Sequence, residues 1–122
     1  NAWEAARVAE GYTLIKCFLH VSKEEQKKRL AARLVGPDKY WKYNPGDLDS
    51  RAKWDAYEDA YNAALTRCNP DAAPWYVIPA DKKWYRDWAV AELLREKMAE
   101  LNLDWPAPTF DVEAERARVA AS

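Results

Sequence analysis

The sequence is poor in glycine, with only three glycines among 122 residues. Many phosphate-binding folds present backbone amides to the phosphates through a glycine-rich turn before a helix. None of Gly11, Gly36 and Gly46 belongs to a GxxxxGK[ST] or GxGxxG motif. These 122 residues therefore contain no loop that cradles phosphate through its backbone amides.

Cysteine and histidine are equally scarce. The two cysteines, Cys17 and Cys68, lie far apart and outside any CxxC or metal-ligand spacing. We predict two reduced thiols in a cytoplasmic protein, since a disulfide would depend on a geometry that the sequence does not show. The single histidine, His20, has no suitably spaced serine or cysteine, so a hydrogen-bonded structural role is favoured over a catalytic one. The carboxylates form no recognisable metal-binding motif either.

Long apolar runs and an excess of charge of one sign are also missing. No apolar run approaches the roughly 20 residues that span a bilayer. The first ten residues do not follow the order of a signal peptide, and the absence of an initial methionine favours a start inside a longer protein or after processing. The net charge of −1 argues against bulk attraction to nucleic acid or an anionic membrane. We therefore expect neither nucleic acid nor membrane as a partner.

Aromatic residues, by contrast, are abundant, with seven tryptophans and seven tyrosines. Large aromatic side chains bury much apolar area, so we interpret most of them as filling a core built from few elements. Stacking on a ligand is the alternative interpretation.

The hydrophobic pattern predicts an α/β order of elements. Residues 1–10 form the end of a helix that stops at Gly11, and the apolar run over 13–21 is typical of a strand buried on both faces. Ser22 and Glu25 form a capping box, in which the Glu25 side chain accepts from the Ser22 amide. The helix that they open extends to about residue 34.

A segment rich in proline and turn-forming residues, 37–50, is predicted to be a long functional loop. Asp49 or Ser50 then caps a helix to about residue 68, and its aromatic stripe faces a core. Residues 75–80 form a short strand, 82–101 an amphipathic helix, and an extended tail ends in a short helix from about Asp111. Two parallel strands cannot form an independent domain, so these elements indicate part of a larger sheet.

Cations gather around the long loop, where they could surround a polyanion. Arg29 and Arg33 share a helix face, and guanidinium groups grip phosphate oxygens in pairs. From spacing alone, an ordinary solvated face in which Glu24 and Glu25 pair with Lys28 and Arg29 is the favoured alternative. The full set is Lys27, Lys28, Arg29, Arg33, Lys39, Lys42 and Arg51.

A second candidate follows the second strand. Ligands in open α/β sheets bind at the carboxyl ends of the strands, and Asp81, Lys82 and Lys83 come directly after such an end. Helix capping by Asp81 explains the same residues equally well.

Three segments together resemble the polyphosphate kinase 2 family, in the order that this family shows. They are TLIKCFLHVSKEEQKKRLAAR, PDKYWKYNPGDLDSRAKWDAYEDAY and APWYVIPADKKWYR. The resemblance covers roughly residues 1–101, and residues 102–122 form a less diagnostic tail. It implies the C-terminal part of a P-loop kinase-like three-layer α/β/α fold with a parallel sheet and a helical lid. The lid corresponds to residues from about 24 to 54.

The resemblance also implies a function. Such enzymes move a phosphoryl group between inorganic polyphosphate and a nucleoside mono- or diphosphate, with magnesium held mainly by Walker A and B elements that this chain lacks. Because those elements are absent, we do not expect these 122 residues alone to transfer phosphate. AMP, ADP, ATP or guanine nucleotides are the implied nucleotide partners, and a homo-oligomer is the implied assembly.

By position, the resemblance turns the basic lid residues into candidate site residues. Those expected to act in catalysis are Arg29, Arg33 and Lys42. Those expected to bind phosphate or nucleotide are Lys39, Arg51, Asp81 and Lys82. A non-catalytic polyphosphate- or nucleotide-binding module is the main alternative, and a purely structural α/β domain is a third.

Overall fold

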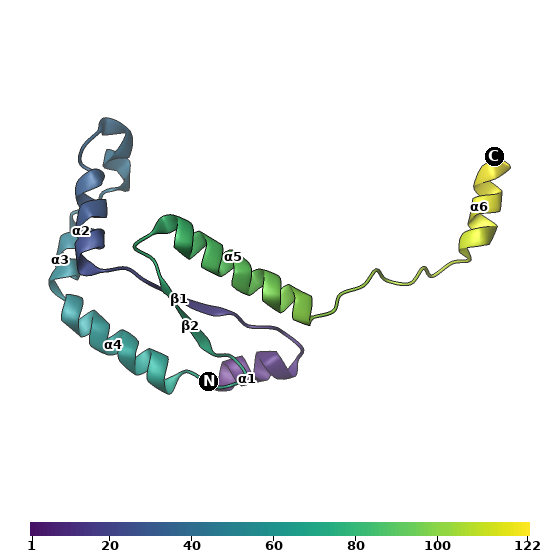
Figure 1. The fold of residues 1–122 in the computed structure, drawn as a ribbon, viewed down its shortest axis with the longest axis horizontal. Helices are drawn as coiled ribbons and strands as arrows, with labels where there is room; N and C mark the ends of the chain where they lie inside the picture. The colour runs from purple at the N-terminus through teal and green to yellow at the C-terminus, as the bar shows by residue number, and fades with distance from the viewer.

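A computed structural model describes all residues from 1 to 122 (Figure 1). The elements follow one another as α1 (Ala2–Ala9), β1 (Lys16–His20), α2 (Lys23–Ala32), the 3₁₀ helix η1 (Pro37–Lys42), α3 (Gly46–Ala52), α4 (Trp54–Arg67), β2 (Trp75–Pro79), α5 (Lys83–Glu100) and α6 (Val112–Ala120). The predicted α/β order is confirmed. The first helix also ends as predicted, because Gly11 adopts a φ of 90° that other residues avoid.

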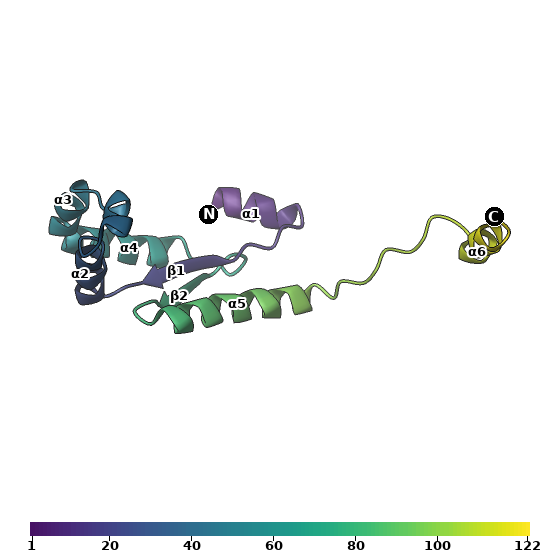
Figure 2. The same ribbon diagram turned by 90° about the horizontal axis from the view of Figure 1, so that it is seen from above.

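The two strands pair in parallel, from Lys16 opposite Trp75 to His20 opposite Pro79. Phe18 and Val77 therefore lie on one face of the sheet, and Leu19 and Ile78 lie on the other. Helix α5 covers one face, while α1 and α4 lie on the opposite side (Figure 2). The arrangement is a narrow α/β/α sandwich.

The predicted aromatic stripe of α4 does face the sheet. The ring of Tyr61 lies 4.8 Å from that of Phe18. On the other face, Ile78 lies beneath α5 and is 3% exposed. These two contacts hold the three layers together.

The expectation that 13–21 forms a strand buried on both faces is wrong for this chain. Leu19 on β1 and Val77 on β2 both remain about half exposed. The whole chain exposes 9839 Å², whereas a compact protein of this mass exposes about 6,700 Å². The physical reason is that the sheet has only two strands, so each strand has an unpaired edge and the helices cover each face incompletely.

The predicted loop over 37–50 is largely helical. Residues Pro37–Lys42 form η1, and α3 begins at Gly46, whose amide donates to the Asn44 side chain over 2.9 Å. Asp47 and Asp49 then lie in the first turn of α3, where carboxylates favour a helix. The prediction that Asp49 or Ser50 caps the next helix is therefore wrong, and α4 begins at Trp54 without a side-chain cap.

The start of α2 follows only half of the predicted capping box. The Ser22 hydroxyl accepts from the Glu25 amide over 3.1 Å, as expected. The Ser22 amide, however, donates to Asp81 over 2.7 Å, and Glu25 pairs with Arg29 instead. Asp81 does not cap α5, whose N-cap is Lys82. A residue distant in sequence thus replaces the local partner.

Beyond α5 the chain leaves the sandwich. Residues 102–111 are extended, and α6 lies well away from the other elements in both views (Figures 1 and 2). Helix α6 begins where predicted, and Asp111 caps it by accepting from the amides of Glu113 and Ala114. None of the helices combines the length and apolar character that a membrane span requires.

The hydrogen bond between Asp81 and Ser22 predicts a pH dependence. The donating Ser22 amide, helped by the charge of Arg29, holds the pKa of Asp81 below its ordinary value. The bond therefore contributes stability that is fully present above the unfolded pKa of about 4. That contribution is lost as the pH falls through the lower folded pKa.

We accordingly expect Asp81→Ala to lower the melting temperature by a few degrees at pH 7 and by less at pH 2. Thermal melts of both proteins by circular dichroism measure the two differences. An equal difference at both pH values would show that the charge of Asp81 contributes nothing to the bond.

Candidate functional site

A cleft of about 780 Å³ opens between residues 24–54, the segment predicted to be a lid and called the lid below, and the sheet. Its apolar wall comes from the sheet and α4, through residues such as Phe18, Tyr61 and Val77. Its polar wall comes from the lid, where three arginines line it: Arg29, Arg33 and Arg51. The cleft thus places guanidinium groups beside aromatic rings.

Arg29 joins the lid to the end of β2. Its Nη2 donates to the carbonyl oxygens of Ala80, over 2.8 Å, and Asp81, over 3.1 Å. Its Nε donates to Glu25 one helical turn earlier, over 2.9 Å. With Nε and Nη2 engaged within the protein, Arg29 holds α2 against the carboxyl ends of the strands.

Arg33 and Arg51 connect α2 with α3 inside the lid. Arg33 Nη1 lies 3.2 Å from Asp47 on α3. Arg51 Nη1 donates to the Lys23 carbonyl and to the Gln26 side chain, each over 2.7 Å. A guanidinium group has five N–H donors, so each of these arginines keeps donors for a ligand in the cleft.

The lysines at the tip of the lid are arranged differently. Lys39 and Lys42 lie in η1, do not line the cleft and form no ion pair in the structure. The Lys42 ammonium lies 4.9 Å from the ring centre of Trp41, which is 77% exposed. This charged, aromatic tip therefore lies outside the lining of the cleft.

Lys82 and His20 lie near the strand ends without an evident ligand-binding arrangement. Lys82 is exposed at the N-cap of α5 and does not line the cleft. His20 lines the cleft and stacks on Phe18 with ring centres 5.9 Å apart. Stacking, rather than the hydrogen bond that we expected, is the contact that its ring makes.

Neither a reactive thiol nor a metal site is evident. Both cysteines are free, as predicted, and burial raises the pKa of Cys17, which disfavours a thiolate. No group of three or more histidine, cysteine, aspartate or glutamate side chains lies close enough to hold a metal ion.

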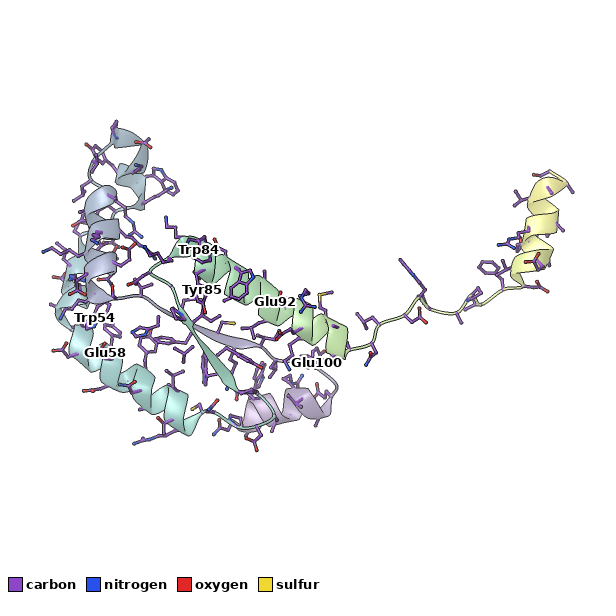
Figure 3. All side chains as sticks on the ribbon, viewed as in Figure 1. Trp54, Glu58, Trp84, Tyr85, Glu92 and Glu100 are labelled. Carbon is purple, nitrogen blue, oxygen red and sulfur yellow. The ribbon has the colours of Figure 1, made fainter.

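One support of the site, Trp54, was not evident from sequence. Trp54 receives the cations of Lys23 and Arg51 over its ring, at 5.9 and 5.8 Å from the ring centre. Trp54 and Glu58 lie in the first turns of α4 beside the lid, whereas Trp84 and Tyr85 belong to the start of α5 (Figure 3). The aromatic stripe of α4 predicted that Trp54 is a core residue. The cations over its ring come from other elements, so the sequence pattern of α4 could not show them.

The model of the family described as Polyphosphate kinase 2 matches residues 1–105. The AMP/ADP-polyphosphate phosphotransferase of Meiothermus ruber is 50% identical over 99 residues, which cover 81% of this chain and 37% of that protein. The ADP-polyphosphate phosphotransferase of Rhodopseudomonas palustris is 41% identical over 101 residues, which cover 83% of this chain and 35% of that protein.

The crystal structure of polyphosphate kinase 2 from Arthrobacter aurescens TC1 matches with a TM-score of 0.97 and 51% identity. The match covers 100% of this chain and 43% of that one. The chain thus spans less than half the length of these three proteins. It belongs to the polyphosphate kinase 2 family.

Proposed function

We propose that the protein transfers a phosphoryl group between inorganic polyphosphate and a nucleoside mono- or diphosphate. The observation that carries the proposal is the cleft in which Arg29, Arg33 and Arg51 stand beside aromatic rings, in a chain of this family. The guanidinium groups suit phosphate groups, and the aromatic rings suit the nucleoside. Both parts of the lining would therefore be used by a polyanion with a nucleoside attached, or by a nucleotide beside a polyphosphate chain.

In this reaction a nucleotide phosphate oxygen forms a bond to the terminal phosphorus of polyphosphate. The bridging P–O bond breaks, and the polyphosphate chain leaves one phosphate shorter. Most of the catalytic effect in such transfers comes from positioning and charge neutralisation. The free donors of Arg33 and Arg51 would bind phosphate oxygens, and Lys39 and Lys42 would add charge when the lid closes.

Arg29, Asp81 and Lys82 would contribute less directly. Arg29 and Asp81 are engaged with the backbone, so we assign them to positioning the lid at the strand ends. Lys82 lies at the same edge of the sheet and would meet a nucleotide that reaches it.

The cofactor and the cellular setting belong to the same proposal. Magnesium would neutralise phosphate charge, and it would be held mainly outside these residues, among which no group of three or more ligating side chains lies together. We place the enzyme in the cytoplasm, where nucleotides are available. The relatives named for AMP or ADP support adenine nucleotides as acceptors, with guanine nucleotides as the alternative.

The proposal predicts dependence on polyphosphate. The natural full-length protein, given ADP and polyphosphate with magnesium, is expected to form ATP, and ATP with AMP is not expected to replace polyphosphate as the donor. Nucleotide chromatography measures both reactions. Equal rates with ATP as the donor would indicate an ordinary nucleoside monophosphate kinase. Binding of polyphosphate without turnover would favour the non-catalytic module.

The lid residues predict two different mutant phenotypes. Lys42→Ala is expected to lower turnover by about tenfold or more and to leave the melting temperature unchanged, because Lys42 forms no ion pair. Arg29→Ala is expected to lower turnover and also to cost about 2 kcal/mol of stability, because two backbone carbonyls lose their donor.

Steady-state kinetics and urea unfolding on both variants check this difference. Trp3→Ser, on the exposed side of α1, serves as the control for a surface substitution away from the cleft. Unchanged stability of the Arg29→Ala variant would show that Arg29 does not anchor the lid. Unchanged turnover of the Lys42→Ala variant would show that Lys42 at the lid tip takes no part in the reaction.

A further inference from the structure

The two ends of the lid meet at the ring of Trp54. Lys23 is the first residue of α2, Arg51 lies in the last turn of α3, and Trp54 is the first residue of α4. The ammonium of Lys23 lies 5.9 Å from the ring centre of Trp54, and the guanidinium carbon of Arg51 lies 5.8 Å from it. Cations within about 6 Å of a ring centre are attracted by the negative face of the ring. One tryptophan therefore holds both the segment that enters the lid and the segment that leaves it.

Two further contacts join the same segments. Arg51 Nη1 donates to the carbonyl of Lys23 and to the side chain of Gln26, each over 2.7 Å. The ammonium of Lys23 lies 3.6 Å from the carboxylate of Asp55, which follows Trp54. All of these contacts lie within residues 23–55, so they do not depend on what covers the outer surface of the protein.

Arg51 is the cation of this junction that lines the cleft. Both of its hydrogen bonds pass through the single nitrogen Nη1, whereas Arg29 is held through Nε and Nη2. An anchor at one nitrogen leaves the direction of the other two open, because the guanidinium group can turn about the anchored atom. A ring against the group restricts that turning, so the face of Trp54 sets where the remaining donors of Arg51 point.

Core packing does not account for the surroundings of Trp54. Tyr61, from the same stripe of α4, packs on the sheet with its ring 4.8 Å from that of Phe18. Trp54 instead lies where α4 meets the lid (Figure 3), with two cations over its ring and no aromatic ring stacked against it. The stripe thus changes from packing on the sheet to holding cations at its first residue.

We propose that Trp54 is a positioning residue of the phosphoryl transfer, which holds the guanidinium group of Arg51 toward phosphate in the cleft. This role rests on the proposed function. Trp54 acts through Arg51 and need not touch a reacting atom itself. Because Lys23 lies over the same ring, Trp54 also ties the position of Arg51 to the start of α2, which the bond between Ser22 and Asp81 fixes at the strand ends.

The first test measures the mobility of Arg51 in the absence of substrate. The ¹⁵N relaxation of the arginine Nε–H groups is recorded for the natural full-length protein and for Trp54→Leu, which keeps an apolar side chain and removes the ring. The Nε–H of Arg51 is expected to become more mobile, while that of Arg33, which pairs with Asp47, is expected to keep its relaxation. Unchanged relaxation of Arg51, or an equal change in both arginines, would overturn the proposal.

A second variant, Trp54→Phe, keeps an aromatic face that attracts cations more weakly. It is expected to raise the mobility of Arg51 by less than Trp54→Leu does. If Trp54→Leu does not fold, Trp54→Phe decides the question, and a mobility of Arg51 equal to that in the natural protein would then overturn the proposal.

The second test is a double-mutant cycle in kcat/KM for polyphosphate. Trp54→Leu is expected to lower kcat/KM about fivefold in the natural protein and by less than about 1.5-fold in the Arg51→Ala background, because the residue through which Trp54 acts is then absent. A purely structural role would cost the same factor in both backgrounds, and that result would overturn the proposal.

Trp3→Leu on α1 is the matched control, because Trp3 lies outside the cleft and has no cation over its ring. It is expected to leave both kcat/KM and the relaxation of Arg51 unchanged. A natural protein without polyphosphate-dependent turnover would overturn the proposed function and with it the part of Trp54 in the reaction. The relaxation measurement decides separately whether Trp54 holds Arg51.

Discussion

The parallel pairing of β1 with β2 is the constraint on which the rest of the structure depends. Parallel pairing brings the carboxyl ends of both strands to one edge, where Ser22 follows the first strand and Asp81 the second. The hydrogen bond between them replaces the local capping partner of α2. The direction of the lid is thereby set by the sheet, rather than by the lid sequence alone.

The basic residues of the lid have different roles, because the lid is held at the strand ends. Arg29 is occupied by carbonyls at the strand end, and Arg33 and Arg51 connect α2 with α3. The arginines thus make the lid one unit before any substrate arrives, and preorganised charge is what phosphoryl transfer requires. Lys39 and Lys42, without ion-pair partners, remain at the tip.

Local patterns predicted most of the fold, whereas the partners of the site required the structure. The apolar runs predicted both strands, and the aromatic stripe on α4 predicted the side that faces the sheet. The partner of the Ser22 amide was mispredicted because Asp81 lies 59 residues away in sequence and comes close only through strand pairing. The lid arginines were predicted as site residues from their positions in the family resemblance. The groups that orient two of them, Asp47 for Arg33 and the Ala80 carbonyl for Arg29, could not be predicted from local sequence.

The most direct test of the central claim is the ¹⁵N shift of the arginine Nε–H groups, recorded by NMR as polyphosphate is added to the natural protein. The account predicts that the signals of Arg33 and Arg51 move, because both keep free donors in the cleft. The signal of Arg29 is expected to stay in place, because its Nε–H already donates to Glu25 and its Nη2 to the strand-end carbonyls, which leaves only Nη1 free. A shift of Arg29 as large as the other two would contradict the account.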